Sequence, residues 1–321
     1  MIASRFRILA LLTPLALAPL HADVTLRYKM EVKMNPTLPP ALAAGAVQGM
    51  AALQQESVLR LKGGKGFSTY MGFESIIDFT TQEMTLLDPA SKQYSKLKYD
   101  QFAEEMGRAM PAMPEQARAA MASFKAEVSP PRATGRTDTI QGVEAEEHEV
   151  TISVAGPAMP NMPAGPMIKM VMQFWSPKAG EAMRVPAIRE LTGYSAWSYA
   201  TMNPVASMSK YMNQLPGFAE AFGPLMKELQ QGPVLRTHME MFMPAMVAML
   251  QRMPAANNPF GAGFDANAPF VQMNQELAEF STAPVPDSVF QIPDGYQEAA
   301  ASAMIQGLLT KSQAAANPAK Q

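Results

Sequence analysis

The residues of this chain best suited to bind a soft metal lie in the stretch "RTHMEMFMP", residues 236–244. Three methionines occupy every second position, and a histidine and a glutamate lie next to them. These residues are Met239, Met241, Met243, His238 and Glu240. Thioethers bind Cu(I), so one interpretation is a copper site, completed by the further methionines of residues 159–172.

The alternation itself favours a different interpretation. In a β-strand successive side chains point to opposite faces, so His238 and Glu240 would face away from the methionines. The chain also holds 28 methionines, spread over its whole length rather than gathered in one ligand cluster. We therefore interpret the stretch as the apolar face of a strand, with copper as the alternative. We predict that the methionines face a helix-covered side of a sheet and that His238 and Glu240 face outward.

Motifs that would indicate an enzyme are incomplete. The chain has no cysteine, and "EEHEV", residues 146–150, lies in an alternating segment rather than in a zinc-peptidase helix. "GYSAW", residues 193–197, lacks the last glycine of a nucleophile elbow. "GGKG", residues 63–66, lacks the Lys-Ser/Thr ending of a phosphate-binding loop and predicts a hairpin turn. We predict a protein that is not an enzyme, with no catalytic residue, metal or cofactor.

Two further groups of residues admit a functional and a structural interpretation. The glutamates next to His148 could bind a cation or could form the solvated face of a strand; they are Glu144, Glu146, Glu147 and Glu149. Trp175 and Trp197 could stack on a ligand or could lie in the core and at its rim. We favour the structural interpretation of both groups.

Residues 1–22 have the pattern of a secretory signal peptide. A positive start is followed by an apolar run that is too short to span a bilayer. Cleavage could follow Ala18 or Ala22, and we favour Ala22 because cleavage after Ala18 would leave Pro19 first. The chain has no cysteine to carry a lipid anchor. We predict a periplasmic protein that touches membranes only transiently.

Composition favours a folded protein with a large core. Hydrophobic residues make up 48% of the chain and charged residues 17%. Removal of Arg5 and Arg7 with the leader leaves 24 of the 26 basic residues against 28 acidic ones, a net charge of −4. That charge gives no general reason to bind nucleic acid. We expect a monomer without disulfides.

Alternating hydrophobicity predicts a largely antiparallel β protein. "VTLRYKMEVKM", residues 24–34, places its apolar side chains on one face and its charged ones on the other. Similar patterns predict about eight to ten strands in all, including a last one near residues 270–282. Apolar helical segments are predicted at residues 100–125 and 187–231, and a short helix near the C-terminus. The economical interpretation is one α+β domain.

Three segments carry a resemblance to a known fold. They are the first strand "VTLRYKMEV", the block "LKGGKGFSTYMGFESIIDFTTQEMTLLDPASKQYSKL" and the ending "VPDSVFQIPDGYQ", with Phe290-x-x-Pro293-x-Gly295-Tyr296 the most recognisable piece. Over most of residues 23–297 the chain resembles the LolA/LolB-like superfamily of periplasmic lipoprotein carriers, and within it an uncharacterised family of exported proteins. None of the shared motifs is catalytic. In the ending we predict that Phe290 is buried and that Tyr296 anchors the final turn, because Pro293 fixes φ and Gly295 permits a tight bend.

The resemblance implies a strongly curved antiparallel sheet, an incomplete barrel, with helices covering its concave face. In the carrier members that face holds acyl chains. The expected organisation is a single LolA-like half-barrel domain at residues 23–311 and a disordered tail at residues 312–321. The helical region at residues 186–231 is longer than a minimal carrier needs. No lipoprotein-binding motif is matched, so no such residue is carried over.

The expected function is that of a soluble, non-enzymatic carrier for a lipid or a lipoprotein acyl chain. The alternatives are a structural or protein-interaction module of the cell envelope and a methionine-rich Cu(I)-binding protein. The predicted apolar cavity is lined by Met30, Val32, Phe67, Met71, Phe73, Ile77, Met170, Met172, Phe174, Met239, Met241 and Met243.

Overall fold

A computed structural model describes most of the chain beyond the predicted leader. The described residues are 23–38, 56–70, 73–109, 115, 123–156, 165–202, 218–229, 231–245, 247–248, 265 and 268–316. The predicted signal peptide, residues 1–22, therefore lies outside the described residues. No helix in the described part of the chain is long and apolar enough to cross a membrane.

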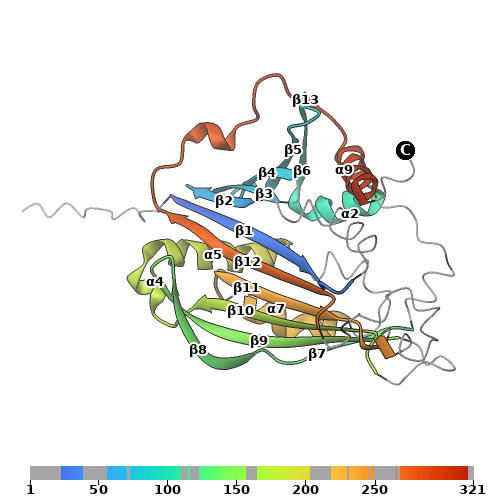
Figure 1. The fold of residues 1–321 in the computed structure, drawn as a ribbon. Coiled ribbons are helices and arrows are strands. Elements are labelled where there is room, and N and C mark those ends of the chain that lie inside the picture. The colour runs from blue at the N-terminus through green and yellow to red at the C-terminus, as the bar shows by residue number, and fades with distance from the viewer. Residues whose placement is uncertain are drawn as a thin grey trace, which may run out of the picture.

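A single sheet of 13 strands dominates the described structure (Figure 1). In sequence order the strands are β1 (Val24–Met34), β2 (Ser57–Lys62), β3 (Lys65–Tyr70), β4 (Phe73–Asp78), β5 (Glu83–Asp88), β6 (Gln93–Lys98), β7 (Lys125–Val128), β8 (Arg132–Ile140), β9 (Val143–Ala155), β10 (Ile168–Pro177), β11 (Arg236–Phe242), β12 (Val271–Ser281) and β13 (Gln297–Glu298). Their spatial order is β13-β6-β5-β4-β3-β2-β1-β12-β11-β10-β9-β7, with β8 also paired to β9.

The sheet is antiparallel except for the short pairing of β13 with β6. It does not close into a barrel, because β13 and β7 lie at opposite ends of the strand order. The central pairing joins β1 to β12, two strands from the two ends of the chain. The predicted α+β class with a large antiparallel sheet is thus confirmed, although the strands outnumber the eight to ten expected from the sequence.

The predicted hairpin turn at "GGKG" is confirmed. Gly63 and Gly64 form the turn between β2 and β3, with φ of +52° and +80°. Positive φ at both central positions suits a tight antiparallel turn and favours glycine. The turn sets the pairing of Lys62 with Lys65 and of Leu61 with Gly66.

The next turn corrects one prediction. Phe67 and Ile77 were both predicted to line the cavity, which would require one alternation to run through the whole segment. The structure divides it into β3 and β4 and pairs Tyr70 with Phe73. Even-numbered residues of β3 therefore share a face with odd-numbered residues of β4, and Phe67 lies on the face opposite to Ile77.

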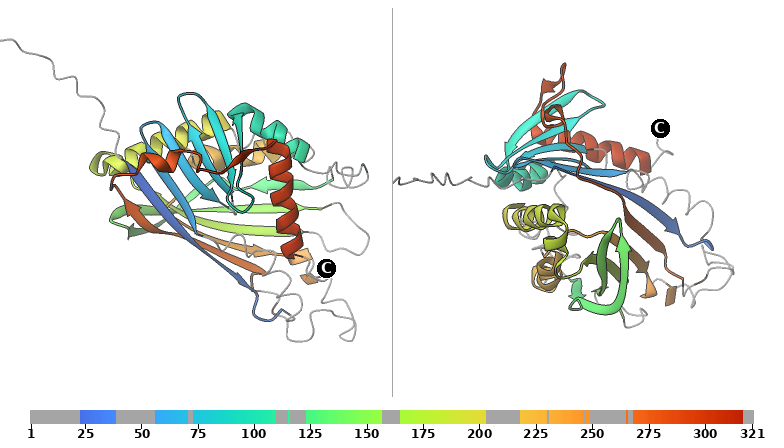
Figure 2. Two further views of the ribbon diagram at one scale, coloured as in Figure 1. Left: turned by 90° about the horizontal axis from the view of Figure 1, so that it is seen from above. Right: turned by 90° about the vertical axis from the view of Figure 1, so that its left-hand side faces the viewer.

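Two groups of helices pack against one side of the sheet. The helices are α2 (Tyr99–Ala109), α4 (Glu181–Arg184), α5 (Pro186–Met202), α7 (Phe218–Leu229) and α9 (Ala301–Ala316). Helix α5 contributes Ile188 and Leu191 to a core cluster with Leu26 of β1 and Leu61 of β2. Helices α2 and α9 form a second cluster over β4–β6 (Figure 2). Helix α9 continues to Ala316, past residue 312, the predicted start of a disordered tail.

The other side of β3–β6 is covered by the segment that follows β12. Its short 3-10 helix η3 (Asp287–Phe290) ends in Phe290, which is buried against Ile76 and Leu87. Tyr296 packs partly against the same cluster, after Gly295 with φ of +82°. The predicted burial of Phe290 is confirmed, and Phe67 belongs to this cluster rather than to the helix side.

Replacing Phe290 tests how much this cluster contributes to stability. Phe290→Ala should lower the free energy of unfolding by about 3–5 kcal/mol, because it removes a buried ring and leaves a cavity. Denaturant titration measures the change. Gln291→Ala, at the exposed neighbouring position, is the control and should leave the midpoint nearly unchanged. A loss well under 1 kcal/mol for Phe290→Ala would show that the segment is not part of the core.

Candidate functional site

Strand β11 lies between β10 and β12, and its register decides what the "RTHMEMF" stretch does. Met239 lies opposite Met172 of β10 and opposite Met273 of β12. Met241 lies opposite Met170 of β10. Directly opposed residues of antiparallel strands share a face, so these methionines form one patch.

We call this patch the methionine face. It comprises Met30 and Met34 of β1, Met273 of β12, Met239 and Met241 of β11, and Met170 and Met172 of β10, all seven of them half-buried. Val32 and Val271 lie among them and are buried. The polar residues on this side of β11 and β12 are Thr237 and Gln275, opposite each other. In these four strands, no position on this side is occupied by Lys, Arg, Asp or Glu.

The opposite side of the same strands is polar. His238 Nδ1 lies 2.6 Å from Asn274 Oδ1, and Gln272 donates to Glu240 at 3.0 Å. Arg236 pairs with Asp138 and with Glu276, both at 2.7 Å. The prediction that His238 and Glu240 face away from Met239 and Met241 is confirmed. Met243 follows the last residue of β11 and is half-buried, so the strand alternation does not place it.

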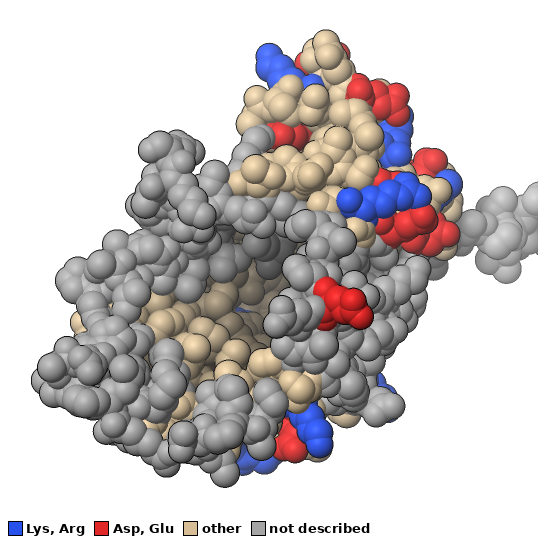
Figure 3. Space-filling view, turned by 90° about the vertical axis from the view of Figure 1, so that its right-hand side faces the viewer, with Lys and Arg blue, Asp and Glu red and all other residues tan. Residues whose placement is uncertain are grey.

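Helix α7 packs on the same side of the sheet as the methionine face. Leu225 is buried against Val150, Ile152 and Phe174, and Leu229 packs partly against them. Met170 and Met172 border this cluster. Figure 3 views the molecule from the end at which β1 finishes and shows a hollow; the described residues on its floor are mostly neither acidic nor basic.

A cavity of about 250 Å³ lies beneath α5, on the same side of the sheet as the methionine face. Its lining includes Leu26, Tyr28, Leu191 and Tyr194, and Gln275 at the border of the methionine face. The Tyr28 hydroxyl donates to the Val234 carbonyl at 2.9 Å, so this phenol joins β1 to the segment that enters β11. Burial raises the pKa of Tyr28.

Seven of the twelve predicted cavity residues lie together in the structure. The remaining five lie elsewhere, lie outside the described part or are not placed by the strand alternation. Together on the helix side are Met30, Val32, Met170, Met172, Phe174, Met239 and Met241. Ile77 lies on the same side but is buried in the cluster under α2 and α9. Phe67 lies on the other side, Met71 lies outside the described residues, and Phe73 belongs to β4 but its side chain lies outside the described part.

Sequence reasoning missed residues that the pairing adds. Met273 and Val271 come from β12, and Leu225 comes from α7. The alternation of Val271, Met273 and Leu277 in "VQMNQEL" was a usable signal, interrupted by Gln275. For Leu225 no local signal could have named the strands that it contacts.

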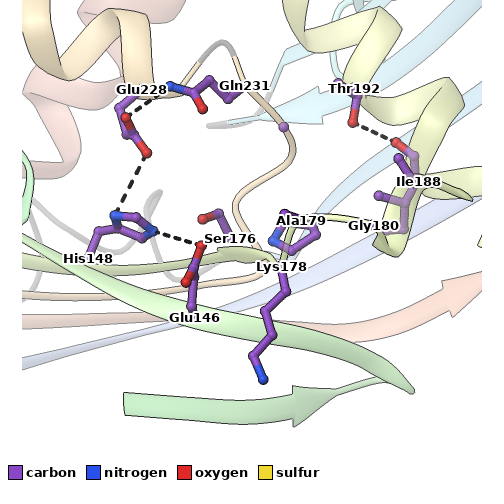
Figure 4. Close-up of a pocket in the computed structure, with 13 residues that line it drawn as sticks. Glu146, His148, Ser176, Lys178, Ala179, Gly180, Ile188, Thr192, Glu228 and Gln231 are labelled. Atoms are coloured by element: carbon purple, nitrogen blue, oxygen red, sulfur yellow. Dashed lines mark hydrogen bonds and ion pairs between the residues drawn. The ribbon is translucent and has the colours of Figure 1, made fainter. Parts of the chain in front are cut away.

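A second, polar pocket of about 240 Å³ lies between β9, β10, α5 and α7 (Figure 4). Its centre is His148, whose ring stacks on Phe174 with centroids 5.4 Å apart. Nδ1 of His148 lies 3.7 Å from Glu228 Oε1 of α7, and Nε2 lies 3.7 Å from Glu146 Oε1. Gln231 donates to Glu228 at 3.0 Å.

The polar pocket lies where β9 meets α7. Both separations from His148 exceed hydrogen-bond length, and its Nε2 is buried without a hydrogen-bond partner among the described residues. No group of three or more His, Cys, Asp or Glu side chains in the described ranges could hold a metal ion.

The four glutamates near His148 do not converge on one cation. Glu144 lies 3.4 Å from Lys178, whereas Glu147 is buried and pairs with Arg136 of β8. Glu149 accepts from Gln173, and this hydrogen bond, followed by its contact with Arg132, lowers the pKa of Glu149. The glutamates therefore serve separate pairs. The predicted solvated face is wrong for Glu147, which is 3% exposed.

No protein-family model matches the chain, and no curated protein matches it either. The resemblance to the LolA/LolB-like carriers therefore stays a prediction.

Tyr28 gives a prediction for alkaline pH. Burial raises the pKa of Tyr28 in the folded chain, so above about pH 10 the unfolded chain binds fewer protons than the folded one. Stability that is present below that pH is lost as the pH rises. Burial raises the pKa of Tyr99 as well. Tyr28→Phe should therefore reduce the alkaline slope by up to about 1.4 kcal/mol per pH unit, and Tyr28→Phe with Tyr99→Phe should reduce it further.

The measurement is the free energy of unfolding from denaturant titrations at several pH values above about 9. Loss of the hydrogen bond to Val234 lowers stability at every pH, whereas loss of the titrating phenol changes the slope. An unchanged slope in Tyr28→Phe would contradict the burial of this phenol.

Proposed function

We propose that this protein binds an apolar ligand, a lipid or an acyl chain, on the methionine face and carries it through the periplasm. The helix-bearing side of the sheet is in this proposal the concave face of a half-barrel, as in the LolA/LolB-like carriers. Helices α5 and α7 cover it, and the proposed carrier is exported and monomeric.

The observation that carries the proposal is the incomplete packing of the methionine face. Its seven methionines are half-buried, whereas Met84 and Met304 in the cluster under α2 and α9 are 4% and 5% exposed. Contiguous exposed apolar surface commonly marks a binding site. The hollow in Figure 3 lies at the end of the molecule where β1 finishes.

The chemistry of the lining supports an apolar and variable occupant. Methionine is unbranched and polarisable, so it adapts to several apolar shapes. The side of β10, β11, β12 and β1 that carries the methionines offers only Thr237, Gln275 and Ser176 as uncharged polar side chains besides the Tyr28 phenol. A charged ligand group would find no counter-charge on these strands and would lose hydration.

The contacts of α7 and the cavity beneath α5 bear on how a ligand would be accommodated. Leu225 and Leu229 of α7 pack on β9 and β10 by apolar contact. Glu228, also of α7, lies 3.7 Å from His148 of β9. The cavity beneath α5 borders the methionine face at Gln275. An acyl chain that lies on the methionine face could extend its end beneath α5.

Binding of N-phenyl-1-naphthylamine, a neutral apolar fluorophore, tests the proposal. Met239→Gln with Met241→Gln should raise the Kd of the fluorophore about tenfold or more, since an amide against an apolar ligand costs roughly 1–3 kcal/mol. His238→Gln with Glu240→Gln introduces the same side chains on the other face of the same strand. It should leave the Kd unchanged.

Unfolding titrations of both double variants establish that they are folded at the assay temperature. Absence of fluorophore binding by the unaltered chain, or equal Kd values for the two double variants, would overturn the proposal. Native mass spectrometry of protein purified from its own periplasm should show an additional lipid mass.

Hydrogen exchange tests the covering role of the helices. A bound apolar ligand should slow amide exchange in α5 and α7, because it adds contacts beneath both helices. Helix α9, which packs over β6 with α2, is the internal control and should exchange equally with and without ligand. Equal exchange of α5 and α7 in both states would count against a cover that closes on the ligand.

A further inference from the structure

The methionine face gathers seven thioethers on strands that carry no charge on that side. Met172 of β10 lies opposite Met239 of β11, and Met239 lies opposite Met273 of β12. Met170 and Met241 form the neighbouring pair on β10 and β11. All of these side chains keep part of their surface exposed. The reactive atom that recurs across the patch is therefore thioether sulfur.

Thioether sulfur is open to oxidation in this chain, because the chain has no cysteine to compete for an oxidant. The sulfur lone pair attacks one oxygen of hydrogen peroxide and the O–O bond breaks. The proton on the transferred oxygen passes to the leaving hydroxide, which departs as water. Methionine is thereby oxidised by two electrons to its sulfoxide, peroxide is reduced by two, and sulfoxide reductases reverse the change.

Exposure separates three groups of described methionines. Met183, on α4, is 87% exposed. The methionine face is half-buried, whereas Met84 and Met304 are almost fully buried under α2 and α9. A buried thioether meets an oxidant only when the chain opens locally, so reactivity should follow this order.

A sulfoxide would change how the methionine face accommodates an apolar ligand, because its S=O group is a polar acceptor. The polar side chains on this side of β11 and β12 are Thr237 and Gln275. They lie one row away from Met239 and Met273, in the direction of α5. A sulfoxide oxygen covered by an apolar ligand would lose its hydration, and the other methionines of the face offer no hydrogen-bond donor in exchange.

We propose that the methionine face is a site of reversible oxidation by hydrogen peroxide and that its sulfoxides prevent the binding of an apolar ligand. The first part stands on the exposure and chemistry of the thioethers, and the second rests on the proposed function. Neither step changes the charge of the face or the pairing of its strands. Oxidation would release the ligand, and reduction would restore the binding surface.

The oxidation site is tested by treating the purified protein with hydrogen peroxide and locating sulfoxides by tandem mass spectrometry of its peptides. Met183 should react first and the methionine face next. Met84 and Met304 should react last, at least roughly threefold more slowly than the face. Equal rates for the face and for these two buried residues would overturn the site, as would a face that reacts after them.

Fluorophore binding tests the consequence of oxidation. The reaction is stopped with catalase while Met84 and Met304 are still thioethers, so the packing under α2 and α9 is unaltered. The Kd of N-phenyl-1-naphthylamine should then be about tenfold higher or more, and sulfoxide reductases A and B should restore it. An unchanged Kd with the face oxidised would overturn the control of binding. So would a Kd that stays high once mass spectrometry shows the thioethers restored.

A site variant assigns the effect to the methionine face. It carries leucine at Met172, Met239 and Met273, which roughly conserves volume but removes three oxidisable sulfurs. The measured quantity is the ratio of its Kd after oxidation to its own Kd before, so nothing is assumed about its starting affinity. Leucine does not react with peroxide, so this ratio should be clearly smaller than in the unaltered protein.

The matched control carries leucine at three methionines outside the face, Met84, Met183 and Met304. Its Kd ratio should equal that of the unaltered protein, and unfolding titrations establish that both variants are folded. Equal ratios in the two variants would show that sulfoxides elsewhere cause the loss, and would overturn the proposed role of the face.

The two proposals fail separately. Absence of fluorophore binding by the unaltered, unoxidised protein would overturn the proposed function and with it the control of binding. The order in which the methionines are oxidised is measured without any ligand. A face that reacts no faster than Met84 and Met304 would therefore overturn the oxidation site even where the fluorophore binds.

Discussion

The pairing of β11 between β10 and β12 is the constraint on which the methionine face depends. One register aligns Met172, Met239 and Met273 on one side and Gln173, His238 and Asn274 on the other. A slip of one residue would turn the polar row toward α7 and expose the methionines. Buried unpaired polar groups are costly, whereas in the native register Asn274 and His238 are already hydrogen-bonded to each other. Both faces therefore select the same register.

Features that depend on one strand could be predicted from the sequence. Alternation within β1 and β11 is a local property, and it correctly identified the polar and apolar sides of both. The glycines at 63 and 64 identified the β2–β3 turn because positive φ is a single-residue property. The burial of Phe290 was predicted from its close neighbours in the sequence, because Pro293 fixes φ and Gly295 permits a tight bend.

Features that depend on pairing between distant segments could not be predicted. The place of Met273 beside Met239 follows from the strand order, which no single stretch encodes. Phe67 was misplaced because the pairing of Tyr70 with Phe73 reverses the relation between odd and even positions. The polar pocket was missed because Glu228 reaches His148 only after α7 packs on β9. In each case the missing information is which elements meet.

The contrast between two groups of methionines is the basis of the proposed binding role. Met84 and Met304 are buried by α2 and α9 and act as ordinary core. The seven residues of the methionine face keep part of their surface exposed. Full burial of such a side chain is worth roughly 1.5–3 kcal/mol, so the folded chain leaves part of that free energy unrealised at each position. An occupant that covers these side chains recovers it, without requiring the sheet to rearrange.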